Sequence, residues 1–353
     1  MSNEIELKLS VNPEFVDFLN QVMSTFVVHH QQSQFLANCY YDSQDQFFAR
    51  QKMGLRVRQE NDRFTLTLKT DGQVQGGLHI RPEYNVELAD AKPDLALLVE
   101  KTGLALGNIE ALELQPIFST DFERKQWLVE CGNGALIEVA FDFGHIYAGE
   151  KTAPICEVEF ELKAGNTTDL LRFVSNLTLE QGVRLSSASK AKRGYQLAKP
   201  QAQRSLNWLD KWRDFLQLEQ TDNHSLSKLT ALFALEQGLI EETFALGQGY
   251  FESDFLATVQ RISAFFNLYH YYTEHAKLLQ EVFQTQQQDL VDEQDFMELI
   301  EQQHGLFNAI KEIIRLHSET QDNALALNKL FQLLQTGQYV KRMLHFISLT
   351  MSQ

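Results

Sequence analysis

The amino-acid sequence predicts an α+β protein, in which a sheet closed on itself is followed by an all-α helical bundle. Before residue 200, about eight segments alternate polar with apolar side chains, which is the period of a β-strand. The polar positions of these segments hold mainly Arg, Lys, Glu and Asp. From about residue 200 the alternation ends, and Leu, Phe, Gln and Glu recur at three- and four-residue spacing, which indicates helices.

The first alternating segment runs from Glu4 to Leu9. Glu4, Glu6 and Lys8 share one face of this predicted strand, and apolar residues take the other face. Two carboxylates and an ammonium group on one face need water, a metal ion or a ligand to be tolerated. Taken alone, the pattern fits an edge strand with a solvated face equally well. Because it returns along the chain, the sequence favours a polar interior shared by several strands.

The other predicted elements follow from the same two periodicities. Alternation predicts strands at 35–41, 55–58, 64–69, 78–88, 112–130, 136–143 and 156–162. Helical spacing and helix-start signals predict helices at 13–29, 44–52, 93–103 and 166–181, most of which can cover the apolar face of the sheet. A short polar stretch with a proline, residues 199–203, separates the predicted domains, 1–200 and 201–353.

The charged strand faces indicate that the sheet closes. An open sheet could turn such a face to water, but a solvated face is usually a mixture rich in Lys, Ser, Thr and Gln. Closure removes the sheet edges and gathers the charges in one interior. Bases around a cavity suit a polyanion with many phosphate oxygens, and clustered carboxylates suit Mg²⁺ or Mn²⁺. The predicted interior holds Lys8, Arg56, Arg58, Lys69, Arg81, Arg124, Lys190, Glu4, Glu6, Glu83, Glu87, Glu138, Asp142, Glu157, Glu159 and Glu161.

Several motifs of the chain resemble one family. Glu4-x-Glu6-x-Lys8 is similar to the ExExK signature of the CYTH superfamily, the triphosphate tunnel metalloenzymes. Further pieces follow in that family's order, at residues 55–58, 67–69, 81, 141–144, 157–159 and 190. Two longer stretches, residues 81–88 and 189–195, resemble bacterial inorganic triphosphatases that carry a helical CHAD domain after the catalytic one. The resemblance covers roughly residues 1–200.

The resemblance implies an eight-stranded antiparallel barrel that forms a tunnel and hydrolyses inorganic triphosphate, or short-chain polyphosphate, with Mg²⁺ or Mn²⁺. It implies metal ligands at Glu4, Glu6, Glu157 and Glu159, and support of a second metal from Glu83, Asp142 and Glu161. Glu87 is an alternative to Glu83, because Pro82 stands where relatives often have an acid. Phosphate binding is implied for Lys8, Arg56, Arg58, Lys69, Arg81, Arg124 and Lys190, and catalytic roles for Glu6, Lys8, Asp142 and Lys190.

The net charge, the cysteine pattern and the apolar runs disfavour several classes of function and location. The net charge of −16 disfavours nonspecific nucleic-acid binding and binding to an anionic membrane surface. The three cysteines, Cys39, Cys131 and Cys156, form neither a disulfide framework nor a CxxC metal motif, which favours a reducing compartment. No leader pattern or membrane-spanning apolar run is found in the sequence, so we expect a cytoplasmic protein. The sequence leaves a homo-oligomer possible.

The C-terminal half resembles a divergent CHAD-like bundle with a regulatory or assembly role. It is short for such a domain and acidic, and its histidines are scattered. His270 and His275 lack the spacing of four residues that would place both on one helix face. Histidines spread in this way more often belong to the surface or the core than to a metal site. Polyphosphate binding by this half is therefore a hypothesis only.

Two other functions remain open from the sequence. Within the enzyme class, the same tunnel could accept thiamine triphosphate, ATP or another organic triphosphate. From a different class, the barrel could bind polyphosphate or nucleotides without hydrolysing them. The full set of carboxylates disfavours this second alternative, since a pure binder of polyanions needs the bases more than the acids.

Overall fold

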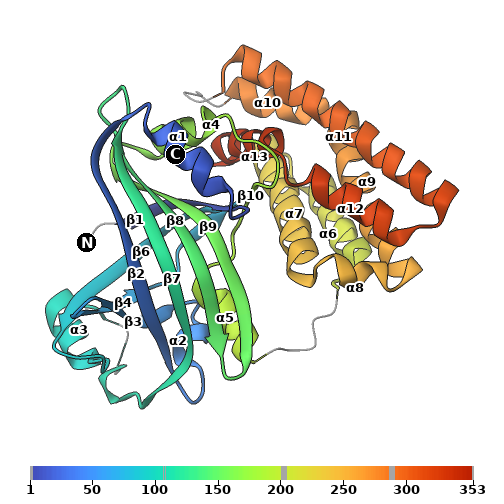
Figure 1. Cartoon of the computed structure of the whole chain (residues 1–353). Helices are drawn as coiled ribbons and strands as arrows, with labels where there is room; N and C mark the ends of the chain where they lie inside the picture. The colour runs from blue at the N-terminus through green and yellow to red at the C-terminus, as the bar shows by residue number, and fades with distance from the viewer. Residues whose placement is uncertain (1–2, 106, 108, 200–204, 286–290, 352–353) are drawn as a thin grey trace. The chain divides into compact units, whose positions relative to one another are not determined.

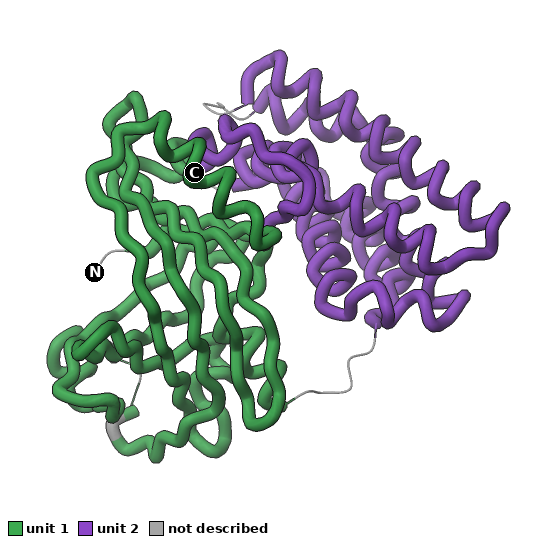
Figure 2. The backbone as a smooth tube through the Cα atoms, viewed as in Figure 1, with its two compact units in different colours: residues 1–170, 186–202 green, residues 171–185, 203–353 purple. Residues whose placement is uncertain are grey.

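The computed structural model describes residues 3–105, 107, 109–199, 205–285 and 291–351 (Figure 1). The chain forms two compact units, which we call the barrel unit (1–170 and 186–202) and the helical unit (171–185 and 203–353) (Figure 2). Residues 171–185 group with the helical unit, whereas the sequence predicts one boundary near residue 200. Most of the predicted linker, from residue 200 on, lies outside the described residues. In the described part of the chain, no helix has the length and apolarity needed to cross a bilayer.

The barrel unit is built on a closed antiparallel sheet (Figure 1). Within the described residues, eight strands pair in the cyclic order β1, β9, β8, β7, β2, β3, β4, β6 and back to β1. Closure occurs at β1 (Asn3–Ser10), which pairs with both β6 (Leu78–Leu88) and β9 (Lys151–Ala164). The α+β fold with an eight-stranded barrel is therefore confirmed. The remaining strands are β2 (Val27–Ser43), β3 (Gly54–Glu60), β4 (Arg63–Lys69), β5 (Gln73–Gln75), which extends the sheet beside β6, β7 (Leu114–Glu130) and β8 (Leu136–Ala148).

Helices cover part of the outer face of the barrel. The apolar residues of β3, β4 and β6 form one buried core with α2 (Phe47–Arg50) and α3 (Leu95–Thr102). The Asp94 carboxylate accepts a hydrogen bond from the Leu97 N–H at 2.8 Å and caps α3, and Gly103, with φ of 67°, ends it. The predicted helix at 93–103 thus covers apolar strand residues, which leaves the polar side of these strands facing the interior.

A helix from the end of the barrel unit packs against the inner apolar residues. Helix α5 (Lys190–Ala198) contacts β7, β8 and β9, and its Ala191 and Tyr195 pack on a cluster that includes Phe118. Gly194 lies so close to this ring that a Cβ there would meet it at 2.1–2.4 Å. The Ser189 hydroxyl accepts a hydrogen bond from the Lys192 N–H at 3.1 Å and caps the helix. Local capping and close packing therefore fix the position of Lys190.

Some predicted boundaries were wrong. The predicted helix at 13–29 is α1 (Phe15–Met23), and the chain is already in β2 at Val27. The polar run 29–34 does not alternate, and its strand conformation comes from pairing with β7, far away in sequence. The helix predicted at 166–181 is the shorter α4 (Thr167–Ser175), and β5 was not predicted. Pairing between distant segments accounts for the largest of these errors, because periodicity does not report it.

The helical unit confirms the periodicity seen after residue 200. One of its buried side chains, Arg342, donates to both carboxylate oxygens of Glu236, at 2.7 and 3.1 Å, and to the Gln303 side chain at 2.9 Å. The hydroxyls of Tyr272 and Tyr339 also donate to Glu236. The elements of the unit are β10 (Arg184–Leu185), α6 (Trp208–Thr221), α7 (Ser225–Leu246), α8 (Gln248–Glu252), α9 (Phe255–Glu274), α10 (Ala276–Thr285), α11 (Glu293–Thr320), α12 (Asn323–Leu333) and α13 (Gly337–Thr350).

Candidate active site

A cavity of about 970 Å³ lies in the barrel unit. Its lining includes every cation that the sequence analysis assigned to phosphate binding, from strands β1, β3, β4, β6 and β7 and from helix α5. Several of the predicted metal ligands line the same cavity, among them Glu4, Glu83, Glu159 and Glu161. Segments that are far apart in sequence therefore bring acids and bases to one enclosed space.

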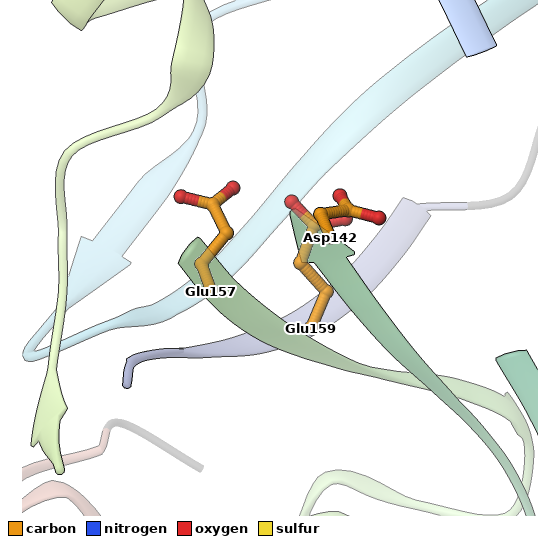
Figure 3. A group of neighbouring side chains, drawn as sticks. All are labelled: Asp142, Glu157 and Glu159. Carbon is orange, nitrogen blue, oxygen red and sulfur yellow. The ribbon is translucent and has the colours of Figure 1, made fainter. Parts of the chain in front are cut away.

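Three carboxylates lie together at one side of the barrel interior, and we call them the acidic cluster: Asp142, Glu157 and Glu159 (Figure 3). Asp142 on β8 is the register partner of Glu157 on β9, and one oxygen from each of the three carboxylates lies within 4.8 Å of the other two. Gly144 lets β8 approach β7 nearby, since a Cβ there would meet the Asp121 carbonyl oxygen at 2.2 Å. The close strands give the cluster a fixed spacing.

Buried ammonium groups neutralise the acidic cluster. The Lys8 Nζ lies 2.9 Å from Glu159 and 3.2 Å from Glu157. The Lys190 Nζ lies 2.6 Å from Asp142 and 2.9 Å from Glu159, and it also contacts Glu157. Burial would lower the pKa of each lysine, but the neighbouring carboxylates more than compensate and raise it. Both side chains therefore carry a positive charge at neutral pH.

An arginine completes this side of the site. Two nitrogens of Arg124 each lie 2.7 Å from an oxygen of Asp142, and its Nη2 also lies 2.7 Å from Glu159. Such a bidentate pair fixes the guanidinium plane as well as its charge. The pKa of Glu159 falls well below its usual value, because Lys190, Lys8 and Arg124 outweigh the opposite effect of burial. The low pKa of Glu159, and that of Asp142, keep these two carboxylates ionised, and their charge is balanced by the neighbouring cations.

A second group of acids and bases lies on β1, β4 and β6. The Lys69 Nζ lies 2.6 Å from both oxygens of Glu4, and the Arg81 Nη2 lies 2.6 Å from Glu6. Burial raises the pKa of Glu4 to about 7, with Glu6 adding to the effect and Lys69 opposing it. In contrast, the pKa of Glu6 is lowered to about 2, since Lys69, Lys8 and Arg81 outweigh burial. Two glutamates on one strand face therefore hold their protons very differently.

Three other predicted acids, Glu83, Glu87 and Glu161, differ in their position relative to the cavity. Glu83 lies 2.9 Å from the Lys69 Nζ and lines the cavity, whereas Glu87 is exposed. This geometry favours Glu83 over Glu87 as a site residue. Glu161 lies at the cavity wall but pairs with Lys163 at 2.7 Å, and burial raises its pKa. Glu161 is not part of the acidic cluster.

Arg56 and Arg58 on β3 stand apart from the other cations. No carboxylate of the described residues lies within 4.0 Å of either guanidinium group. Arg58 donates from Nε to the Asn38 amide oxygen at 2.9 Å, and the Arg56 Nε is buried without a hydrogen-bond partner in the described chain. Burial, together with Arg56 and Arg124, lowers the pKa of Arg58 to about 9. Among the described residues no carboxylate forms a direct ion pair with either cation, and only longer-range attraction, such as that of Glu83 for Arg56, offsets their charge.

Sequence reasoning missed residues that line the cavity or support its arginines. Asn38 orients Arg58 and itself donates to the Thr120 hydroxyl at 3.2 Å. Tyr40 raises the pKa of Arg56 against burial and stacks on Phe118, with 4.4 Å between ring centroids. The sequence does indicate their position, because Asn38 and Tyr40 are two residues apart on one strand and therefore share a face. They were overlooked because neutral side chains resemble ordinary strand residues when charged residues define the pattern.

His79 is the lining residue with the least obvious partner. The ring is buried beside Glu6, Lys8, Lys69 and Arg81. Its pKa is lowered to about 3, chiefly by burial and further by the three cations, although Glu6 acts in the opposite direction. The imidazole is therefore neutral at physiological pH. From the sequence, His79 is expected to neighbour the pocket and not to act as its catalyst, and its place in the cavity lining agrees with this expectation.

The chain is similar to proteins of one known family. The model of the CYTH domain matches residues 2–195, which is more than half of the chain. The chain belongs to the CYTH family. It is 46% identical to the inorganic triphosphatase of Haemophilus influenzae over 99% of this chain and 98% of that protein.

Solved structures are similar to this chain at lower sequence identity. A proposed adenylyl cyclase from Hippeastrum, described as having a dominant triphosphatase activity, is 21% identical with a TM-score of 0.40 over 56% of this chain and 98% of its own. A protein from Pyrococcus horikoshii is 18% identical with a TM-score of 0.36 over 54% of this chain and 97% of its own.

Proposed function

We propose that the protein is an inorganic triphosphatase, which hydrolyses triphosphate to pyrophosphate and phosphate inside the barrel. The observation that carries the proposal is one cavity lined by Arg56 and Arg58, which have no carboxylate partner among the described residues, and by Glu159 of the acidic cluster. A chain of phosphates needs both features, since its oxygens bind guanidinium groups and its charge recruits cations. The curated relative with the same activity and nearly the same length supports this assignment.

We propose Mg²⁺ or Mn²⁺ as the cofactor. The donors are all carboxylate oxygens, which hard divalent cations prefer, and the spacing within the acidic cluster suits a shared ion. Asp142, Glu157 and Glu159 would hold one ion, and Glu4 and Glu6 are further candidates, with Glu83 in support. When bound, such an ion neutralises phosphoryl charge and makes a coordinated water more acidic.

The bases of the cavity would hold the substrate and stabilise charge during the reaction. Arg56 and Arg58 would bind phosphoryl oxygens directly, and Lys69, Arg81, Arg124, Lys8 and Lys190 would surround the rest of the chain. In the reaction, a water oxygen bonds to the terminal phosphorus and the bridging P–O bond breaks. The electron pair of that bond leaves with pyrophosphate, and the proton lost by the attacking water passes to bulk water. Positioning and electrostatics provide most of the catalysis in phosphoryl transfer.

The test is Glu6→Gln, measured by phosphate release from tripolyphosphate with Mg²⁺. We expect release to fall about 1,000-fold or more, because the variant loses a charge from the proposed metal site. Glu87→Gln is the matched control, as Glu87 is exposed on β6, and it should keep wild-type activity. Circular dichroism should report an unchanged barrel in both variants. Near-normal activity of Glu6→Gln would remove Glu6 from the active site.

Organic triphosphates remain the alternative substrates. Tyr40 and Tyr195 line the cavity, and an aromatic wall could contact an organic group. The Tyr195 hydroxyl, however, donates to Asp42 at 2.8 Å, and Tyr40 stacks on Phe118, so both rings have structural contacts already. A panel of tripolyphosphate, pyrophosphate, ATP and thiamine triphosphate with Mg²⁺ or Mn²⁺ distinguishes these cases. Binding of the whole panel without phosphate release would instead support a binding module.

We propose further that residues 1–200 are the catalytic domain and 201–353 a CHAD-like domain. Polyphosphate binding by the helical half is a hypothesis, which calorimetry of the full chain with long-chain polyphosphate can test against tripolyphosphate. The free thiols of Cys39, Cys131 and Cys156 support a reducing compartment, the cytoplasm. The acidic net charge of −16 disfavours nucleic acid as a partner.

A further inference from the structure

His79 occupies a central position in the barrel. It lies on β6 directly opposite Glu6 on β1, as its register partner. Opposed residues of an antiparallel pair have Cβ atoms about 4.5–5.5 Å apart, so the imidazole stands next to the proposed metal-binding glutamate. The residue is 1% exposed and still lines the cavity. The ring is thus at the wall of the space proposed for the substrate, and not in the outer apolar core.

Neither ring nitrogen of His79 has a hydrogen-bond partner among the described residues. A neutral imidazole carries one N–H donor and one acceptor nitrogen, whichever tautomer is present. The neighbouring Glu6 carboxylate is already paired with Arg81 at 2.6 Å. A buried donor without an acceptor is costly, and native proteins rarely keep one without a functional reason. The missing acceptor is expected from a molecule that enters the cavity.

We propose that His79 is a substrate-binding residue, whose ring N–H donates a hydrogen bond to a phosphoryl oxygen of triphosphate. This inference rests on the proposed function, because it requires a phosphate chain in the cavity. A neutral ring adds a donor without adding another positive charge beside Lys8, Lys69 and Arg81. A lysine or arginine at this position would increase repulsion among the bases, whereas an apolar residue would leave one oxygen of the substrate unbound.

The experiment compares His79→Leu with His79→Asn and His79→Gln. Binding of tripolyphosphate is measured by calorimetry in EDTA, and hydrolysis is measured with Mg²⁺. We expect His79→Leu to weaken tripolyphosphate binding about tenfold or more, since it removes a hydrogen bond to a charged acceptor. The amide N–H of Asn can replace the Nδ1 donor and that of Gln the Nε2 donor, so at least one should restore binding to within about threefold. The better variant identifies the donating nitrogen.

The melting temperature of His79→Leu without ligand distinguishes a ligand-binding role of His79 from a structural one. If His79 serves only the ligand, His79→Leu without ligand should melt at the same temperature as wild type or higher, because it removes orphaned polar atoms. A structural histidine would instead make the variant less stable. On wild-type protein, ¹⁵N spectra of the imidazole should change when tripolyphosphate is added, and this measurement does not depend on a variant that folds.

Two results would overturn the inference. One is wild-type affinity of His79→Leu for tripolyphosphate, and the other is an unchanged His79 imidazole spectrum in the saturated wild type. Either result would leave the proposed function intact, provided that wild type still hydrolyses triphosphate. If wild type neither binds nor hydrolyses tripolyphosphate, the proposed function itself fails, and the inference fails with it.

Discussion

Arginine side chains that are buried or half-buried occur in both units of this protein, but their surroundings differ. In the helical unit, Arg342 forms a bidentate pair with Glu236, whose carboxylate also accepts hydrogen bonds from two tyrosines. In the barrel unit, Arg56 and Arg58 have no carboxylate partner among the described residues, and they line a cavity of about 970 Å³. The Arg342–Glu236 pair has its hydrogen-bond partners without a ligand, whereas Arg56 and Arg58 carry positive charge that a ligand could neutralise.

The comparison separates two uses of buried charge. A pair with satisfied hydrogen bonds leaves little energy for a ligand and serves mainly to specify the packing of its helices. Unmatched cations destabilise the empty site, and a polyanion regains that free energy on binding. Neutralising an arginine should therefore mainly reduce stability in the helical unit and mainly reduce ligand affinity in the barrel unit.

The largest effect is expected for Arg342→Met. This variant leaves the Glu236 carboxylate buried without its cation, which costs about 3–5 kcal/mol. Urea denaturation followed by circular dichroism measures the change. The double variant Glu236→Leu/Arg342→Met should recover part of the loss, because no unpaired charge remains although the Tyr272 and Gln303 side chains lose hydrogen bonds. A double variant as unstable as the single one would show that packing, and not charge, holds this part of the helical unit.

A smaller and different effect is expected for Arg56→Gln. The variant leaves no carboxylate without a cation, because Glu83 remains paired with Lys69 at 2.9 Å. The free energy of unfolding without ligand should therefore change by less than about 1 kcal/mol. Affinity for tripolyphosphate should fall about 10–100-fold, because a charged hydrogen bond to the substrate is lost. Calorimetry in EDTA measures the affinity, and Arg63→Gln, at an exposed position of β4, is the matched control. A strong loss of stability with unchanged affinity would contradict the distinction between the two units.

Glu4 and Glu6 sharpen the comparison within one strand. The pKa of Glu4 rises from 4.5 to about 7, so its stabilising contribution is lost as the pH increases through that range. The pKa of Glu6 falls from 4.5 to about 2, so its contribution is present at neutral pH and is lost as the pH decreases through that lower range. Without metal, Glu4→Gln should therefore be more stable than wild type above pH 7, and Glu6→Gln less stable, each by about 1–3 kcal/mol.

Thermal melts in EDTA from pH 4 to pH 9 test this pair of variants. The gain of Glu4→Gln should disappear toward pH 4, whereas the loss of Glu6→Gln should persist there and shrink only in more acidic solution. Two curves with the same sign would show that the lysine and arginine neighbours do not distinguish the two carboxylates.

The smallest effect is expected at the helix that positions Lys190. Ser189→Ala removes the N-cap of α5 and should cost about 1 kcal/mol, while Ser189→Thr keeps the hydroxyl and should cost less. Hydrogen exchange should increase in residues 190–198 of the alanine variant and remain unchanged in the paired strands. Exchange that increases equally in β8 and β9 would mean that α5 and the barrel open together.

The sequence determined much of the fold in advance. Strict alternation located β3, β4 and β6 closely, and it sorted Arg56, Arg58, Lys69, Arg81 and Glu83 onto the inner parity before any pairing was known. Side-chain direction in a strand depends only on local backbone geometry, so these predictions needed no partner. The start of β2 at Val27 could not be predicted in this way, because only pairing with β7 makes that polar run a strand.

By itself, then, the sequence determined which side chains point inward and that the second half is helical, since both depend on local periodicity. Only the tertiary structure decided which charges meet. It paired Lys69 with Glu4 and Glu83, placed Glu87 in solvent, and gave Arg56 and Arg58 no carboxylate partner in the part of the chain that the structure describes. The closed barrel also opposed His79 to Glu6, while no described residue forms a hydrogen bond with either ring nitrogen. Register and closure set these distances, and electrostatic energy depends on distance and burial more than on residue type.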